Sequence, residues 1–144
     1  MTGDIRELAL RFDRALEQKD FEAVLSAFHD DCTITLLGIE LTGRKGARTW
    51  INWLFSHVEE LRFEPVVILT RENIVFEEYI VRARIAGGRT VASRQAEVLV
   101  FEEGRIRSLR LYFDRLDVAE ALAGDFFGRM AISHIRKKST EGLR

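Results

Sequence analysis

Several residue types are scarce in this chain of 144 residues. It has one cysteine, Cys32, which excludes an internal disulfide and fits a reducing compartment. Its one proline, Pro65, and the lack of Ser- or Gly-rich stretches leave no candidate linker. Hydrophobic runs stay well below the roughly 20 residues of a membrane-spanning helix, and the first residues do not resemble a signal peptide. We therefore expect one cytoplasmic domain without a membrane partner.

The chain also lacks an excess of charge of one sign. Lys and Arg number 22 against 23 Asp and Glu, which gives a net charge of −1. A dedicated nucleic-acid-binding protein normally carries a clear basic excess, so nucleic acid is not an expected partner. With 47% hydrophobic and 31% charged residues, the composition is that of a globular domain that can bury a core.

The first part of the chain has a helical pattern that changes to an extended one. Apolar residues at three- and four-residue spacing predict a helix over residues 4–18 and another around Trp50. Asp20 is a suitable N-cap for a short helix between them. A pair of strands is expected within residues 32–42, interrupted by a turn at Gly38.

The rest of the chain is predicted to be mostly strand, followed by helices. Four strands are expected at about residues 62–70, 74–86, 89–101 and 105–114. Asp117 is the expected N-cap of a helix through Leu122, and another apolar stretch runs from Phe126 to Ile135. That stretch suits packing against a partner subunit or, alternatively, lying on a membrane surface. We expect one α+β domain over residues 1–135 and a frayed polar tail over residues 136–144.

Short motifs in this order resemble a known family. They are Asp20-Phe21-Glu22-Ala23-Val24, Asp30-Asp31-Cys32-Thr33-Ile34, Gly43-Arg44-Lys45-Gly46-Ala47, Gly104-Arg105-Ile106 and Leu111-Tyr112-Phe113-Asp114. Over about residues 4–124 the chain resembles the SnoaL-like branch of the nuclear transport factor 2-like (cystatin-like) superfamily. The resemblance implies a cone-shaped, curved antiparallel sheet wrapped round N-terminal helices, with a pocket at the open end and a dimeric assembly.

The superfamily includes polyketide cyclases, ketosteroid isomerases, limonene-epoxide hydrolases and members without known chemistry. Asp114 matches the acid/base aspartate of the cyclases and epoxide hydrolases, and Glu97 matches the protonated acid of the isomerases. Other catalytic positions of the family are occupied by apolar residues, Phe12, Leu36 and Val81. The resemblance therefore implies a pocket but neither complete active site.

Strand pairing offers a second route to the pocket wall. If Glu103-Gly104 is a two-residue turn, Glu97 faces Arg110, Gln95 faces Tyr112, and Ser93 faces Asp114. Extending the pairing through Gly87-Gly88 brings Arg82 beside Ser93. A single β-bulge would instead turn Glu77 and Tyr79 inward.

These residues define the predicted site. Asp114 is expected to transfer a proton, Tyr112 to stabilise an oxyanion, and Glu97 to assist as a second acid. The predicted substrate-binding residues are Phe12, Trp50, Leu54, Arg110, Gln95 and Arg82. Alternatively, Glu97 and Arg110 form a structural ion pair and Asp114 merely ends a strand.

No cofactor and no metal are expected. The three histidines lack partners at metal-ligand spacing, and His57 is predicted to lie at the surface. The expected partners are a small hydrophobic molecule and a second copy of the chain. The copy is expected to bind the convex sheet face through Val98, Val100, Leu109 and Leu111. The leading hypothesis is a small-molecule pocket protein that acts as a lyase, isomerase or cyclase on a hydrophobic carbonyl compound. The alternative is a non-catalytic ligand-binding or dimerisation module of the same fold.

Overall fold

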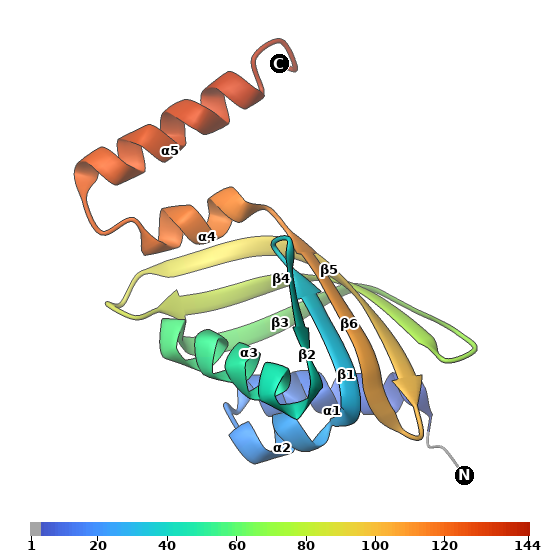
Figure 1. The fold of residues 1–144 in the computed structure, drawn as a ribbon. Helices are drawn as coiled ribbons and strands as arrows, with labels where there is room; N and C mark the ends of the chain where they lie inside the picture. Colours follow the sequence, from blue (N-terminus) through green and yellow to red (C-terminus); the bar gives the residue numbers. More distant parts are fainter. Residues whose placement is uncertain (1–3) are drawn as a thin grey trace.

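A computed structural model describes residues 4–144 and shows a curved sheet with helices at its inner face and its open end (Figure 1). The helices are α1 (Ile5–Glu17), α2 (Phe21–Ser26), α3 (Gly43–His57), α4 (Arg115–Leu122) and α5 (Phe126–Ser139). The strands are β1 (Phe28–Leu36), β2 (Ile39–Thr42), β3 (Val58–Arg71), β4 (Ile74–Ile85), β5 (Thr90–Glu102) and β6 (Arg105–Phe113). Within the described residues, no helix is both long and apolar enough to cross a membrane.

The six strands form one mixed sheet in the order β2-β1-β6-β5-β4-β3. All neighbours are antiparallel except β1 and β6, which run parallel, so the expected α+β class is confirmed but the sheet is not wholly antiparallel. The reason is topological. β2 pairs with one edge of β1, and α3 then carries the chain to the opposite edge of the sheet, which leaves the other edge of β1 for β6.

Aspartate side chains start four of the helices. The side chain of Asp20 accepts a hydrogen bond from the backbone N–H of Ala23 at 3.1 Å, which confirms it as the N-cap of α2. The prediction of Asp117 as the cap of α4 is wrong. Asp114 caps this helix, accepting from the backbone N–H of Leu116 at 2.8 Å, because β6 ends at Phe113 and the helix begins at once.

A β-bulge decides which side chains of β6 face the concave side. The turn at Glu103-Gly104 has two residues in left-handed conformation, as expected for a two-residue hairpin. The register then shifts between Phe101 and Val100, so that Glu97 pairs with Leu111. Ile106 and Leu109 are both fully buried although they are three positions apart, which a regular strand of period two does not allow.

The β4–β5 connection also shifts the register by one residue. Arg84 pairs with Thr90, and the backbone N–H of Ile85 donates to the carbonyl of Arg89 at 2.7 Å, so the loop is one residue longer than the expected two-residue Gly87-Gly88 loop. Glu77 then pairs with Glu97 and Tyr79 with Gln95. This confirms the alternative register in which Glu77 and Tyr79 point inward.

The core closes round three aromatic rings. Phe12 of α1 stacks on Trp50 of α3 with ring centroids 6.3 Å apart, and Phe28 meets both rings edge-on. These side chains join the two helices to the start of β1, with interplanar angles in the range that aromatic pairs favour. They fix the position of α3 over the concave face of the sheet.

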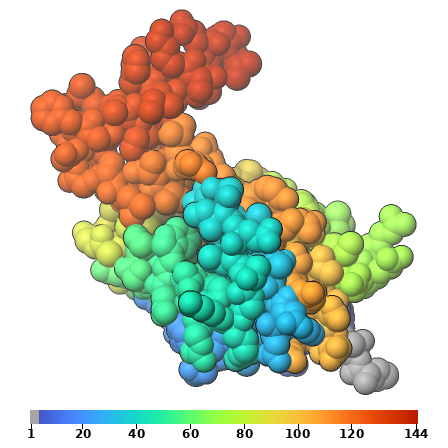
Figure 2. Space-filling view, in the orientation of Figure 1, coloured from blue at the N-terminus to red at the C-terminus, as the bar shows by residue number. Residues whose placement is uncertain are grey.

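The C-terminal helix α5 extends away from the sheet and rests on α4 (Figure 1, Figure 2). Its last turn includes residues 136–139, which were expected to belong to a frayed tail. Arg136 explains the order, because its guanidinium lies 2.9 Å from Asp117 and 3.0 Å from Glu120 of α4. Ionic contacts with α4 thus extend the helix past the predicted boundary.

Candidate functional site

A cavity of about 110 Å³ lies between the concave sheet face, the end of α3 and helix α4. Most of its wall is apolar. Its lining consists of Leu16, Trp50, Trp53, Leu54, His57, Val58, Leu61, Phe63, Tyr79, Val81, Ala83, Ile85, Val91, Ser93, Gln95, Glu97, Leu111, Phe113, Asp117, Val118, Ala121 and Leu122. Such an apolar enclosure with a few polar groups is typical of a small-molecule site.

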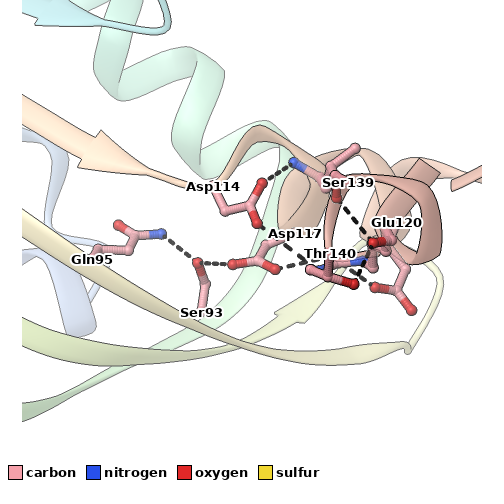
Figure 3. A network of polar contacts seen from close by, with 9 residues as sticks. Ser93, Gln95, Asp114, Asp117, Glu120, Ser139 and Thr140 are labelled. Atoms are coloured by element: carbon pink, nitrogen blue, oxygen red, sulfur yellow. Dashed lines mark hydrogen bonds and ion pairs between the residues drawn. The ribbon is translucent and has the colours of Figure 1, made fainter. Parts of the chain in front are cut away.

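One strand supplies a row of polar groups to this wall. Ser93, Gln95 and Glu97 alternate along β5 and so share the concave face. The Gln95 amide donates to Ser93 Oγ at 3.4 Å, and Ser93 Oγ donates to Asp117 Oδ2 at 2.8 Å (Figure 3). Arg136 donates to the other Asp117 oxygen at 2.9 Å. The row therefore continues from the sheet onto α4 and α5.

Behind Glu97 lies a cluster of three carboxyl groups. Asp13 comes from α1, Glu77 from β4 and Glu97 from β5, and one oxygen of each lies within 4.8 Å of the others. The exposed fractions of Glu77 and Glu97 are 1% and 3%. Both oxygens of Glu77 and one oxygen each of Asp13 and Glu97 have no hydrogen-bond partner among the described residues.

Burial controls the protonation of this cluster. It raises the pKa of Asp13 from 3.8 to about 9, and the nearby carboxylate of Glu77 adds to the shift. The pKa of Glu97 is raised well above its ordinary value, first by burial and then by the charges of Asp13 and Glu77, although hydrogen bonding from Tyr79 acts in the opposite direction. The raised pKa favours the protonated form of Glu97, in which the carboxyl can donate a hydrogen bond.

The same three carboxyls are the buried group best placed to hold a cation, because their oxygens are close enough to share one ion. A second group of suitable spacing, His29, Glu102 and Glu103, lies nearer the surface. In the buried cluster a cation would have to displace protons that the raised pKa values of Asp13 and Glu97 hold in place.

Several predicted site residues do line the cavity. Glu97, Gln95, Trp50 and Leu54 all contribute to the wall. Phe12 does not reach it, because it is buried behind Trp50 in the aromatic core. The predicted residues of β5 and α3 thus lie at the cavity, and their role in binding stays a prediction.

The structure does not bring the predicted residues of β6 to the cavity. Arg110 and Tyr112 alternate with the inward-facing Leu111, and Tyr112 is 56% exposed. Asp114 is half exposed, caps α4 and lies 3.9 Å from Arg136. The predicted Glu97–Arg110 pairing is wrong, because Glu97 pairs with Leu111. The bulge in β6 turns Arg110 and Tyr112 to the outer face of the sheet.

Arg82 also lies on the outer face of the sheet. It pairs with Ala92 across β5, not with Ser93, and its guanidinium donates to Glu64 at 2.7 Å. The cavity therefore receives no charge from this residue.

Sequence reasoning missed Asp13 and Asp117 and placed His57 at the surface. In the structure His57 is half-buried and lines the cavity. Its position could have been read from helical spacing, since His57 follows Trp50, Trp53 and Leu54 by seven, four and three residues. Asp13 gave no such signal, because it flanks the buried stripe of α1 and meets Glu77 and Glu97 only in the folded chain.

Residues 9–109 match the model of the SnoaL-like domain, which covers well over half of the chain. The chain therefore belongs to the SnoaL-like family. No curated protein matches its sequence significantly.

Solved structures share the fold at low sequence identity. A candidate polyketide cyclase from Pseudomonas putida is 18% identical with a TM-score of 0.75, over 85% of this chain and 99% of that one. An epoxide hydrolase from M. tuberculosis is 24% identical with a TM-score of 0.69, over 90% and 94%. A hypothetical protein of ketosteroid isomerase-like fold from Catenulispora acidiphila, in complex with trimethylamine, is 19% identical with a TM-score of 0.72, over 84% and 93%. At such identities these likenesses show the fold alone.

Proposed function

We propose that this chain binds a small hydrophobic carbonyl compound and rearranges it by acid–base chemistry, as a lyase, isomerase or cyclase. The observation that carries the proposal is the buried, protonated carboxyl of Glu97 in an otherwise apolar cavity. A neutral acid in such a place donates a hydrogen bond to a carbonyl oxygen. It stabilises the negative charge that this oxygen gains when a neighbouring carbon loses a proton.

The surroundings of Glu97 support this role. Burial and the neighbouring Asp13 and Glu77 disfavour ionisation of its carboxyl. The mostly apolar wall strengthens a hydrogen bond to a developing charge. Solved structures of this fold include an epoxide hydrolase and a candidate polyketide cyclase, and an acid in this cavity is compatible with such chemistry.

The second candidate function is ligand binding without turnover, in a module that also dimerises. It is favoured by the apolar residues Phe12, Leu36 and Val81 at positions where the family resemblance implies catalytic groups. It is favoured too by Asp114, whose carboxylate caps a helix outside the cavity.

Two variants of Glu97 separate these functions. Glu97→Gln keeps the size of the side chain but replaces the acidic O–H donor by a weaker N–H donor, whereas Glu97→Ala removes the donor. We expect Glu97→Gln to lower turnover of β,γ-unsaturated cyclic ketones or β-keto esters by about 10²- to 10⁴-fold, while ketone affinity changes little. Glu97→Ala should weaken both.

The control is Glu22→Gln, the same change at an exposed position of α2. Steady-state kinetics and ligand titration by calorimetry on folded samples give both quantities. Turnover that persists in Glu97→Gln would exclude Glu97 as the acid. Ketone binding without any turnover by the unaltered protein would favour the binding module.

A further inference from the structure

We propose that His57 is the proton acceptor of the cavity, taking the proton that the carbonyl compound loses while Glu97 holds the carbonyl oxygen. The assignment rests on the proposed function and adds to it a catalytic base, for which the family resemblance leaves no candidate inside the cavity. Both residues line the same cavity, Glu97 from β5 and His57 from the end of α3.

The contacts of the imidazole define which nitrogen is free. Nδ1 lies 2.7 Å from the backbone oxygen of Trp53, one helical turn earlier. A carbonyl oxygen only accepts, so Nδ1 must carry the hydrogen in this contact, and Nε2 of the neutral ring keeps its lone pair. Ser56 Oγ, 3.3 Å from Nδ1, and the Trp53 indole, 5.7 Å from the imidazole, hold the ring on the same side. The geometry therefore gives a basic nitrogen of fixed tautomer.

The other titratable groups of the lining are poor acceptors. Glu97 is protonated, and burial raises the pKa of Tyr79 well above its ordinary value, so its phenol also keeps its proton. Asp117 accepts from Ser93 through one oxygen and from Arg136 through the other. His57 is the lining group that remains with a free lone pair on a ring nitrogen.

Charged groups around α3 suit a histidine that gains and returns a proton. Lys19, in the turn after α1, donates to the carbonyls of Phe55 and Val58, at 3.0 and 2.7 Å, on either side of His57 in the sequence. It fixes the last turn of α3. Once protonated, the ring is favoured by the Trp53 carbonyl and by the negative end of the helix dipole.

The remaining charges belong to neighbouring elements. Asp117 of α4 lines the same cavity but is already paired with Arg136. On β3, Glu59 and Glu60 are paired with Arg84 of β4. Each of these acids therefore already has a cationic partner, which Glu59 and Glu60 share.

The proposed step is balanced without a further reagent. The electron pair of the C–H bond next to the carbonyl forms a carbon–carbon double bond, and the proton moves to His57 Nε2. The carbonyl π electrons move to the oxygen, which accepts a hydrogen bond from Glu97. Return of the proton from His57 to another carbon of the conjugated system completes an isomerisation, and both residues regain their starting states.

The test uses the whole chain, and the probe is a β,γ-unsaturated cyclic ketone. Long-range ¹H–¹⁵N correlation of histidine-labelled protein should show His57 with hydrogen on Nδ1 at pH 8. Exchange of the α-hydrogens of the ketone in D₂O should fall about 10²- to 10⁴-fold in His57→Gln and show no such fall in His134→Gln, a change on the exposed face of α5.

The outcomes separate the two proposals. Exchange that survives in folded His57→Gln, or an Nε2-protonated tautomer, would overturn the role of His57 and leave the role of Glu97 standing. Exchange that persists in Glu97→Gln but not in His57→Gln would overturn Glu97 alone. No exchange by the unaltered protein would overturn the proposed function and this assignment together.

Discussion

Replacing Asp13 by Asn should stabilise the protein, and the gain should grow as the pH rises. Asp13 is buried beside Glu77, and its pKa is raised from 3.8 to about 9. In the unfolded chain this carboxyl ionises above about pH 4, and water hydrates the carboxylate. In the folded chain burial prevents this hydration. Its contribution to stability is thus fully present below pH 3.8 and is lost as the pH rises through about 9.

The magnitude follows from the same pKa shift. Each pH unit between the two pKa values costs the folded state about 1.4 kcal/mol. Between pH 5 and pH 8 the burial of Asp13 therefore costs up to about 4 kcal/mol more. Asn has nearly the same shape, cannot ionise, and its amide can donate to the unpartnered oxygens of Glu77.

Urea unfolding followed by tryptophan fluorescence measures the effect, because Trp50 lies in the core beside the cavity. The free energy of unfolding of Asp13→Asn and of the unaltered protein is compared at pH 5, 6.5 and 8, at one protein concentration. The matched control is Asp31→Asn, an exposed aspartate whose carboxylate accepts no hydrogen bond among the described residues. It should shift stability by less than about 0.5 kcal/mol at every pH.

Two results would refute the reasoning. A stabilisation that is the same at pH 5 and pH 8 would mean that the folded and the unfolded chain do not differ in the protonation of Asp13 over this range. A loss of stability at pH 8 would mean that the carboxylate form is satisfied in the folded state, for example by a bound cation shared with Glu77 and Glu97.

Two other predictions concern the ends and the surface of the molecule. Arg136→Gln removes the ion pairs with Asp117 and Glu120, so the backbone amides of α4 should exchange with deuterium about 10-fold faster. The control Lys137→Gln should leave this exchange unchanged. Equal exchange in both variants would show that Arg136 does not hold α4 and α5 together. On the convex sheet face, Leu69, Ile74 and Phe76 are exposed beside Val98 and Val100, which supports a homodimer through this face, although Leu109 and Leu111 turn inward. Light scattering at micromolar concentration should give a dimer that Phe76→Glu converts to a monomer, and a monomeric unaltered protein would contradict it.

The arrangement of helices and strands was predictable because it depends on local patterns. The stripe that includes Phe12 and Leu16 predicted α1, and the Asp20 cap predicted the start of α2. The Glu103-Gly104 turn was correct as well. What failed was the register beyond that turn, because one extra residue near Arg107 exchanges the two faces of β6.

Two features of the sequence indicate this shift. Ile106 and Leu109 stand at odd spacing, and both are apolar enough to require burial. On β4 the odd-numbered row of Val75, Glu77, Tyr79, Val81, Ala83 and Ile85 is more apolar than the even-numbered row, which favours the register in which Glu77 faces inward. The meeting of Glu77 with Asp13 had no such signal, since it depends on how α1 lies across the sheet.

The family match and the cavity do not cover the same part of the chain. The match ends at residue 109, yet Leu111, Phe113, Asp117 and three apolar residues of α4 belong to the cavity wall. The elements common to the family thus carry Glu97 and His57, while the segment after β6 closes the cavity over them. Because Ser93 donates to Asp117 and Asp117 pairs with Arg136, the position of this wall depends on contacts made outside the matched region. Under the proposed function, selection among carbonyl compounds should therefore vary with α4 and α5 even where the proposed acid and base are retained.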